Sequence, residues 1–66
     1  MEQREGYVEH IIFRNEENFY TVFEMESTEG KVTCTGNVPA ISEGESCLVK
    51  GSFVNHTVYG EQFRVE

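Results

Sequence analysis

Strand-like runs separated by turn residues fill this sequence from end to end, and this pattern constrains the fold more than any other feature. Five runs, at residues 6–13, 19–26, 31–36, 46–54 and 61–66, are rich in β-branched and aromatic residues. No window keeps a 3.6-residue apolar period over the roughly ten residues that a helix needs. The sequence therefore predicts an all-β fold with little or no helix.

The first two runs are predicted to form a β-hairpin across the polar turn at residues 14–18. In the second run, Phe19, Thr21, Phe23 and Met25 alternate with Tyr20, Val22, Glu24 and Glu26. In the third run, Val32 and Cys34 are expected on one face, and Lys31, Thr33 and Thr35 on the other. This clean alternation is typical of strands with one buried face.

The number and spacing of the runs favour a small closed barrel. Five short strands with turns every 8 to 12 residues or so are typical of a barrel or sandwich, and closure removes the exposed strand edges that a short chain tolerates badly. Gly51, inside the fourth run, is expected to mark a bulge or a sharp bend. We therefore predict one domain, residues 1–66, with the five-stranded Greek-key barrel known as the OB-fold.

The net charge of the chain limits the kinds of partner that it can bind. Twelve acidic residues face five basic ones, which gives a formal net charge of -7. A nucleic-acid-binding domain is expected to show a basic patch, so the acidity favours a solubilising surface or a basic protein partner. The chain has neither the roughly 20 apolar residues that span a membrane nor the apolar core of a signal peptide. We therefore expect a cytoplasmic protein with no membrane partner.

The cysteines and histidines are not predicted to form a disulfide or a metal site. Cys34 and Cys47 lie in strand-like runs, where a free thiol behaves as a small apolar group, and small disulfide-stabilised domains are usually richer in cysteine. His10 and His56 have none of the spacings typical of zinc ligands. We therefore expect free thiols in a reducing cytoplasm and no bound metal.

The segment Asn55-His56-Thr57-Val58-Tyr59-Gly60 lies between the last two runs and allows three interpretations. These are a ligand site, a glycosylation acceptor at Asn55-His56-Thr57, and a hairpin turn. The acceptor interpretation requires secretion, which nothing in the sequence indicates, and the metal-site form of the first lacks partner residues. We therefore predict a turn in which Asn55 leaves one strand, Gly60 enters the next and Tyr59 packs back on the barrel.

Catalysis is not predicted for this chain. The carboxylates are scattered over turns and strand faces, and neither a GxGxxG sequence nor a Walker A sequence occurs. No pairing of a nucleophile with a base can be proposed. We therefore expect no catalytic residues and no cofactor within these residues.

A nucleic-acid surface is the binding function that the residues allow. OB-folds bind single strands by stacking bases on aromatic side chains in a basic groove, usually over strands two and three. The candidate residues are Arg14, Phe19, Tyr20, Phe23, Lys31, Lys50 and Arg64. The competing interpretation places the aromatic rings in the core, which is favoured for any single ring, and the basic residues on an ordinary surface.

Several motifs together resemble the N-terminal domain of RecD-like ATP-dependent DNA helicases, the bacterial superfamily 1B enzymes related to the exodeoxyribonuclease V alpha subunit. The matching motifs are Gly6-x-Val8-x-x-Ile11, Asn15-Glu16-x-Asn18 with Tyr20-Thr21-Val22, Thr35-Gly36-x-x-Pro39, Glu43-Gly44-Glu45, Gly51-x-x-x-Asn55-His56 and Tyr59-Gly60-x-Gln62-Phe63. They keep their order and spacing over nearly the whole chain. The resemblance implies an OB-like domain at the start of a longer helicase.

One position departs from the family pattern. A glycine often follows the asparagine of the first hairpin in that family, and here Phe19 takes its place. Because the residue that most easily adopts a positive φ is missing, we expect the turn to bend at Asn18 or earlier.

The resemblance implies a parent enzyme that hydrolyses ATP with Mg²⁺ and unwinds DNA from 5′ to 3′ in repair or recombination. Two hypotheses stay open for the domain itself. It is an accessory module that binds single-stranded DNA, or a module that docks on the rest of the helicase chain or on a protein partner through its acidic surface. For the fragment alone, the net charge favours the second hypothesis.

Overall fold

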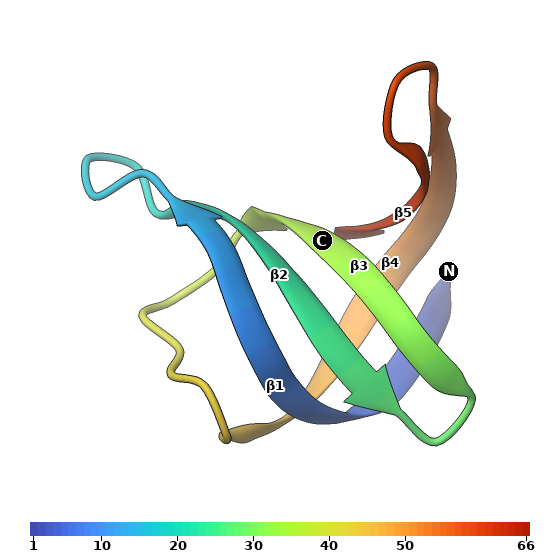
Figure 1. Cartoon of the computed structure of the whole chain (residues 1–66), viewed down its shortest axis with the longest axis horizontal. Coiled ribbons are helices and arrows are strands. Elements are labelled where there is room, and N and C mark those ends of the chain that lie inside the picture. The colour runs from blue at the N-terminus through green and yellow to red at the C-terminus, as the bar shows by residue number, and fades with distance from the viewer.

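The computed structural model describes residues 1–66 as five strands without a helix (Figure 1). The strands are β1 (Glu2–Arg14), β2 (Tyr20–Ser27), β3 (Gly30–Asn37), β4 (Ser46–His56) and β5 (Gly60–Val65). They close into a barrel in the order β1-β2-β3-β5-β4, in which only β3 and β5 are parallel. The all-β, OB-like Greek-key prediction is confirmed.

The strand bounds agree with the predicted runs except at the start of the chain. β1 begins at Glu2 rather than at Gly6, because residues Glu2 to Tyr7 pair with Gly51 to Ser46 of β4. This segment has little apolar character of its own. It becomes a strand through its partner, and that pairing closes one side of the barrel.

Two register shifts in β1 decide which of its side chains face the core. They lie between Val8 and His10 and between Ile11 and Phe13, so one additional residue is inserted at each point against β2. Val8 is buried and Ile11 packs against the core, whereas Ile12 and Phe13 are both exposed. The second bulge therefore turns two consecutive apolar side chains outward.

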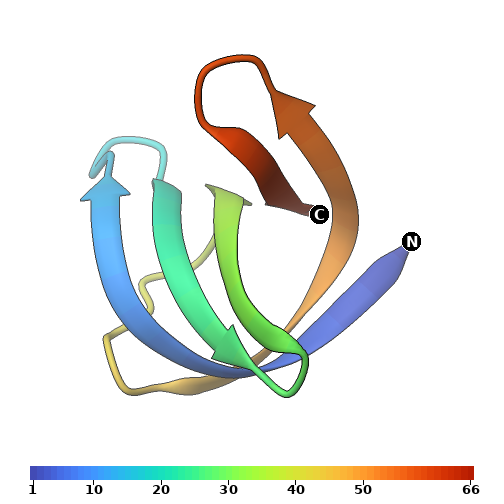
Figure 2. The ribbon, with the colours of Figure 1, turned by 45° about the vertical axis from the view of Figure 1, so that its right-hand side comes forward.

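Gly6 and Gly51 lie where the two long strands change partners. Gly6 of β1 pairs with both β2 and β4, and Gly51 of β4 pairs with both β1 and β5. A Cβ atom on Gly51 would lie 1.8 Å from the carbonyl oxygen of Arg64. The register of β4 is continuous at Gly51, so of the predicted bulge or sharp bend the bulge is absent. Figure 2 shows β4 as one smoothly curved strand.

The core lies inside the barrel and draws on every strand and on the β3–β4 connection. Its buried apolar members are Val8, Phe23, Met25, Cys34, Val38, Val49 and Phe63. The predicted alternation of β2 is confirmed, since Thr21, Phe23 and Met25 are buried. Thr35, expected on the outer face, is also buried because it lies in the seam where β3 pairs with β5.

The turn of the first hairpin bends at Phe19, contrary to the expectation that it bends at Asn18 or earlier. Phe19 has a φ of 61°, the only positive value outside glycine. The side-chain oxygens of Asn15 and Asn18 accept hydrogen bonds from the N–H groups of Glu17 and Tyr20. The asparagines therefore fix the turn through hydrogen bonds, and Phe19 provides the left-handed residue.

Both cysteines are free thiols, as predicted. Cys34 is fully buried, and burial raises the pKa of its thiol to about 12. Cys47 is half-buried and its pKa is raised by the same cause. No three His, Cys, Asp or Glu side chains come close enough to hold a metal ion. The domain has no helix of the length and hydropathy required to cross a membrane.

Candidate ligand-binding hollows on the outer barrel face

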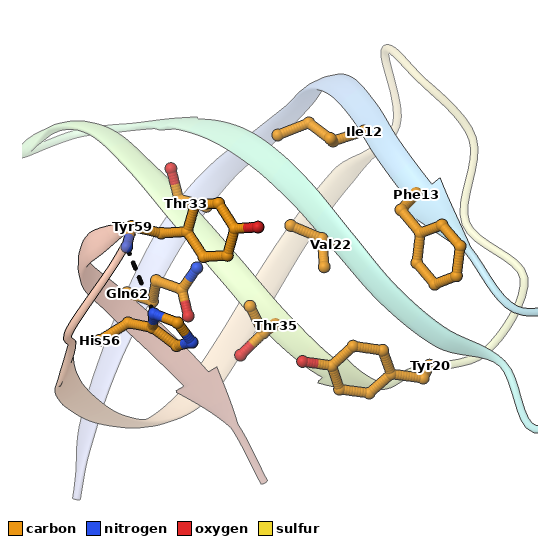
Figure 3. A pocket seen from close by; sticks show the side chains of 9 residues that line it. All are labelled: Ile12, Phe13, Tyr20, Val22, Thr33, Thr35, His56, Tyr59 and Gln62. Atoms are coloured by element: carbon orange, nitrogen blue, oxygen red, sulfur yellow. Dashed lines mark hydrogen bonds between the residues drawn. The ribbon is translucent and has the colours of Figure 1, made fainter.

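The largest hollow, with a volume of about 540 Å³, lies on the outer face of β1, β2 and β3 (Figure 3). The turn between β4 and β5 forms its far wall. We call it the aromatic hollow; its lining residues are Ile12, Phe13, Tyr20, Val22, Thr33, Thr35, His56, Tyr59 and Gln62. None of these residues carries a carboxylate, an ammonium or a guanidinium group.

Aromatic rings stand on two sides of this hollow. Phe13 and Tyr20 are about half and two-fifths exposed, and Tyr59 is 75% exposed. Figure 3 shows the hydroxyl groups of Tyr20 and Tyr59 turned toward the middle of the hollow from opposite sides. The hollow therefore offers flat apolar surfaces together with uncharged hydrogen-bonding groups, which suits a planar ring with a polar edge.

Each wall follows from the local structure of one strand or turn. The second bulge of β1 supplies Ile12 and Phe13, and the alternation of β2 supplies Tyr20 and Val22. Three residues, 57–59, connect β4 to β5, and Gly60 follows with a φ of 81°, as is usual for three-residue hairpin loops. This turn holds Tyr59 away from the core, and the predicted packing of Tyr59 on the barrel is limited to an outer position in which the residue stays 75% exposed.

A second hollow, of about 400 Å³, adjoins the first and shares Tyr20, Thr35, His56 and Gln62 with it. We call it the arginine hollow, because Arg64 of β5 is the only charged residue in its lining. Asn37 and Asn55 add side-chain amides. None of the four salt bridges of the domain involves Arg64, so its guanidinium is available to an anion.

Two of the seven predicted nucleic-acid-binding residues come together at these hollows. Tyr20 lines both, and Arg64 lines the second. The pair joins an exposed aromatic ring to an unpaired cation, which is the combination that single-strand binding requires.

Two other predicted residues are held by groups of the domain itself. Arg14 is half-buried and donates to the carbonyl oxygen of Ile41, which ties β1 to the β3–β4 connection. Lys31 lies 2.9 Å from a carboxylate oxygen of Glu9, and its pKa is raised by that hydrogen bond and by the charges of Glu9, Glu24 and Glu26. Neither side chain faces the hollows.

The remaining three predicted residues lie elsewhere. Phe23 is 1% exposed in the core, so its ring is not available to a base, contrary to the prediction. Phe19 is partly exposed at the tip of the first hairpin, and Lys50 lines a separate hollow that includes Val49 and Glu66. The predicted strip of seven residues therefore does not form one surface.

Most of the residues that line the aromatic hollow were not predicted from the sequence as binding residues. The apolar pair Ile12-Phe13 was a signal, since two adjacent apolar residues in a strand cannot both face one core without a bulge. His56, Tyr59 and Gln62 belong to the family motifs, yet their position opposite β2 depends on closure of the barrel. No local pattern indicates that position.

The barrel order, with a hollow over β2 and β3 beside the β4–β5 turn, defines this chain as an OB-fold domain. A family model agrees with that assignment. The model of the OB-fold domain of ATP-dependent DNA helicase YrrC matches residues 1–66, and the chain belongs to this family. No solved structure matches the chain.

Proposed function

We propose that this domain is a non-catalytic accessory module of a RecD-like 5′-to-3′ DNA helicase acting in repair or recombination, and that it contacts single-stranded DNA at the two adjoining hollows. One observation carries the proposal: Tyr20 and His56 connect an uncharged aromatic hollow to a hollow with the unpaired guanidinium of Arg64. A nucleotide has the same two parts, a stacking base and a charged phosphate. In this assignment the rest of the helicase chain binds ATP and Mg²⁺.

The charge of the domain limits the affinity of such a contact. Phosphate neutralisation supplies most of non-specific affinity for DNA, and only Arg64 is placed to provide it here. The net charge of -7 repels the strand at long range. We therefore expect weak binding by the isolated domain. Attachment to a helicase that already holds the strand compensates, because a short tether creates an effective concentration of roughly millimolar order.

The test is a titration of a fluorescently labelled oligo-dT with the domain at several salt concentrations. One phosphate contact predicts a slope of about -0.7 for log affinity against log salt. Tyr59→Ala should weaken binding by about tenfold, the loss expected for one stacked base. Arg64→Gln should reduce the slope to near zero. Lys50→Gln is the matched control and should change neither.

The proposal fails if the domain does not bind oligo-dT at low salt and if Tyr59→Ala leaves the DNA affinity of the whole helicase unchanged. Equal effects of Arg64→Gln and Lys50→Gln would also count against it. Such a result would indicate a general charge effect rather than a site.

A second candidate function is docking on a basic surface of the helicase chain or of a protein partner. The observation that favours it is the concentration of Glu9, Glu24 and Glu26 around Lys31, which leaves this part of the outer face acidic. Titration of the separately produced remainder of the helicase with this domain tests the docking. Glu24→Gln with Glu26→Gln should weaken that complex, and Arg64→Gln should not.

A further inference from the structure

The β4–β5 turn that carries Tyr59 is tied to the domain by one imidazole. Nδ1 of His56 accepts hydrogen bonds from the backbone N–H groups of Val58, at 3.0 Å, and of Tyr59, at 3.2 Å. No other hydrogen bond involves residues 57–59. Val58 and Tyr59 are both about three-quarters exposed, so packing contributes little to the position of the turn.

These bonds require Nδ1 of His56 to act as an acceptor. Both partners of Nδ1 are donors, so Nδ1 has no hydrogen and its lone pair is shared between them. In a neutral imidazole the remaining hydrogen then lies on Nε2. An imidazolium has a hydrogen on each nitrogen, and it cannot accept either bond.

The same imidazole supports the ring of Tyr59. The two ring centroids lie 4.9 Å apart with an interplanar angle of 38° (Figure 3). Both rings line the aromatic hollow. The backbone bonds and the ring contact together hold Tyr59 as the far wall of that hollow, opposite Tyr20.

We propose that His56 is a positioning residue for Tyr59: its neutral imidazole holds the β4–β5 turn over the aromatic hollow, and protonation of Nδ1 releases the turn and weakens binding of a planar ligand there. The weakening of ligand binding rests on the proposed function, whereas the release of Tyr59 does not. His56 acts through Tyr59 and is not assigned a contact with the ligand.

Few charged groups lie near His56. Tyr59 of the turn and Tyr20 of β2 are the other titratable groups that line the aromatic hollow. From β5, Arg64 shares the arginine hollow, and Glu61 follows the Gly60 that pairs with His56. β3 presents the neutral Thr35 and Asn37. No carboxylate forms a salt bridge with His56, unlike His10, whose Nδ1 lies 3.1 Å from Glu43.

Nuclear magnetic resonance of the domain tests the positioning directly. Two-bond nitrogen–proton spectra of the imidazoles at neutral pH should show His56 with its hydrogen on Nε2. During acidification from about pH 8 to about pH 5, the range over which histidines change charge, the Tyr59 ring signals and the Val58 and Tyr59 amides should move together with the His56 ring signals. They should not follow those of His10.

Two substitutions separate positioning from a direct contact. His56→Ala should disorder the turn and weaken binding of oligo-dT severalfold at neutral pH. His56→Asn keeps a side-chain oxygen that accepts N–H groups two residues on, as in Asx turns. It should restore binding and abolish the dependence on pH between about pH 8 and pH 5. His10→Ala is the control and should leave the pH profile unchanged.

The positioning proposal is overturned if Nδ1 of His56 is protonated at neutral pH, or if the Tyr59 signals are the same in His56→Ala as in the parent domain. Failure of the proposed function has a different signature. In that case oligo-dT does not bind at any pH, while the Tyr59 signals still follow the protonation of His56.

Discussion

Phe19 shows at the scale of one residue how this domain tolerates a strained turn. Its φ of 61° lies in the left-handed region, which costs about 1–2 kcal/mol for a residue with a side chain. Three hydrogen bonds to its main chain hold it there: its N–H donates to the Asn15 carbonyl oxygen, and its own carbonyl oxygen accepts from the Thr21 hydroxyl and the Val38 N–H. These bonds involve only the main chain of Phe19, so they do not require its ring.

We predict that Phe19→Gly stabilises the domain. Removal of the left-handed strain outweighs the entropy that glycine loses on folding, about 0.5–1 kcal/mol. We expect the free energy of unfolding to rise by about 0.5–1 kcal/mol, measured by urea denaturation. Phe19→Ala is the control, since it removes the ring and keeps the strain, and should not stabilise. Equal effects of glycine and alanine would show that the ring, not the backbone, governs this position.

The two long strands, β1 and β4, close the barrel. Each is long enough to pair with one neighbour over its first half and with another over its second half. Gly6 and Gly51 occupy the two crossover points, where the backbone of a neighbour lies too close for a side chain. The bulges of β1 then turn Ile12 and Phe13 outward, which couples barrel closure to formation of the aromatic hollow.

The element-scale prediction concerns Gly51→Ala. The new Cβ would lie 1.8 Å from a carbonyl oxygen of β5, which cannot move without breaking the β4–β5 pairing. We expect the free energy of unfolding to fall by about 2–4 kcal/mol, a large loss for a point mutation. Ser52→Ala, one residue along β4, is the control and should change stability by less than about 1 kcal/mol. A small effect of Gly51→Ala would mean that β5 can shift without opening the barrel.

At low salt the domain is no larger than the range of its own electrostatic field. Its principal extents are 26 × 26 × 19 Å, and its formal charge is -7. At about 0.01 M salt the screening length is about 30 Å, so every carboxylate repels every other across the domain, whereas at about 0.1 M it is about 10 Å. The two salt bridges with both partners exposed, His10–Glu43 and Lys31–Glu9, offset this repulsion only slightly.

The whole-molecule prediction is that added salt stabilises the domain. Screening weakens the repulsion among the excess acidic groups more than it weakens a few exposed ion pairs. We expect Tm to rise by about 2–4 °C between about 0.01 and about 0.1 M NaCl, measured by thermal denaturation. Glu16→Gln with Glu17→Gln, two exposed turn residues without salt bridges, should raise Tm at low salt and reduce the salt effect. A fall of Tm with salt would show that the ion pairs dominate.

Part of the candidate site was predicted from the sequence, but most of its lining residues were not. Tyr20 is among the predicted stacking residues of the second run and Arg64 is a predicted basic residue on a neighbouring strand, and both line the arginine hollow. Phe23 is also a candidate stacking residue, although the core is favoured for any single ring, and it lies on the inward face of the same strand. The alternation distinguishes the two faces of a strand, but it does not say which face is covered.

Local sequence patterns are sufficient to predict the five strands, the approximate positions of their turns and the absence of a helix, because alternation and turn chemistry act between residues close in the chain. Local patterns do not predict the start of β1, the bulges, the burial of Phe23 or the position of the two hollows side by side. Each of these depends on pairing between distant segments, such as Glu2 to Tyr7 with Ser46 to Gly51. The role of His56 depends on both local and distant interactions. Its hydrogen bonds are local to the turn, whereas the hollow that they shape exists only once the barrel closes.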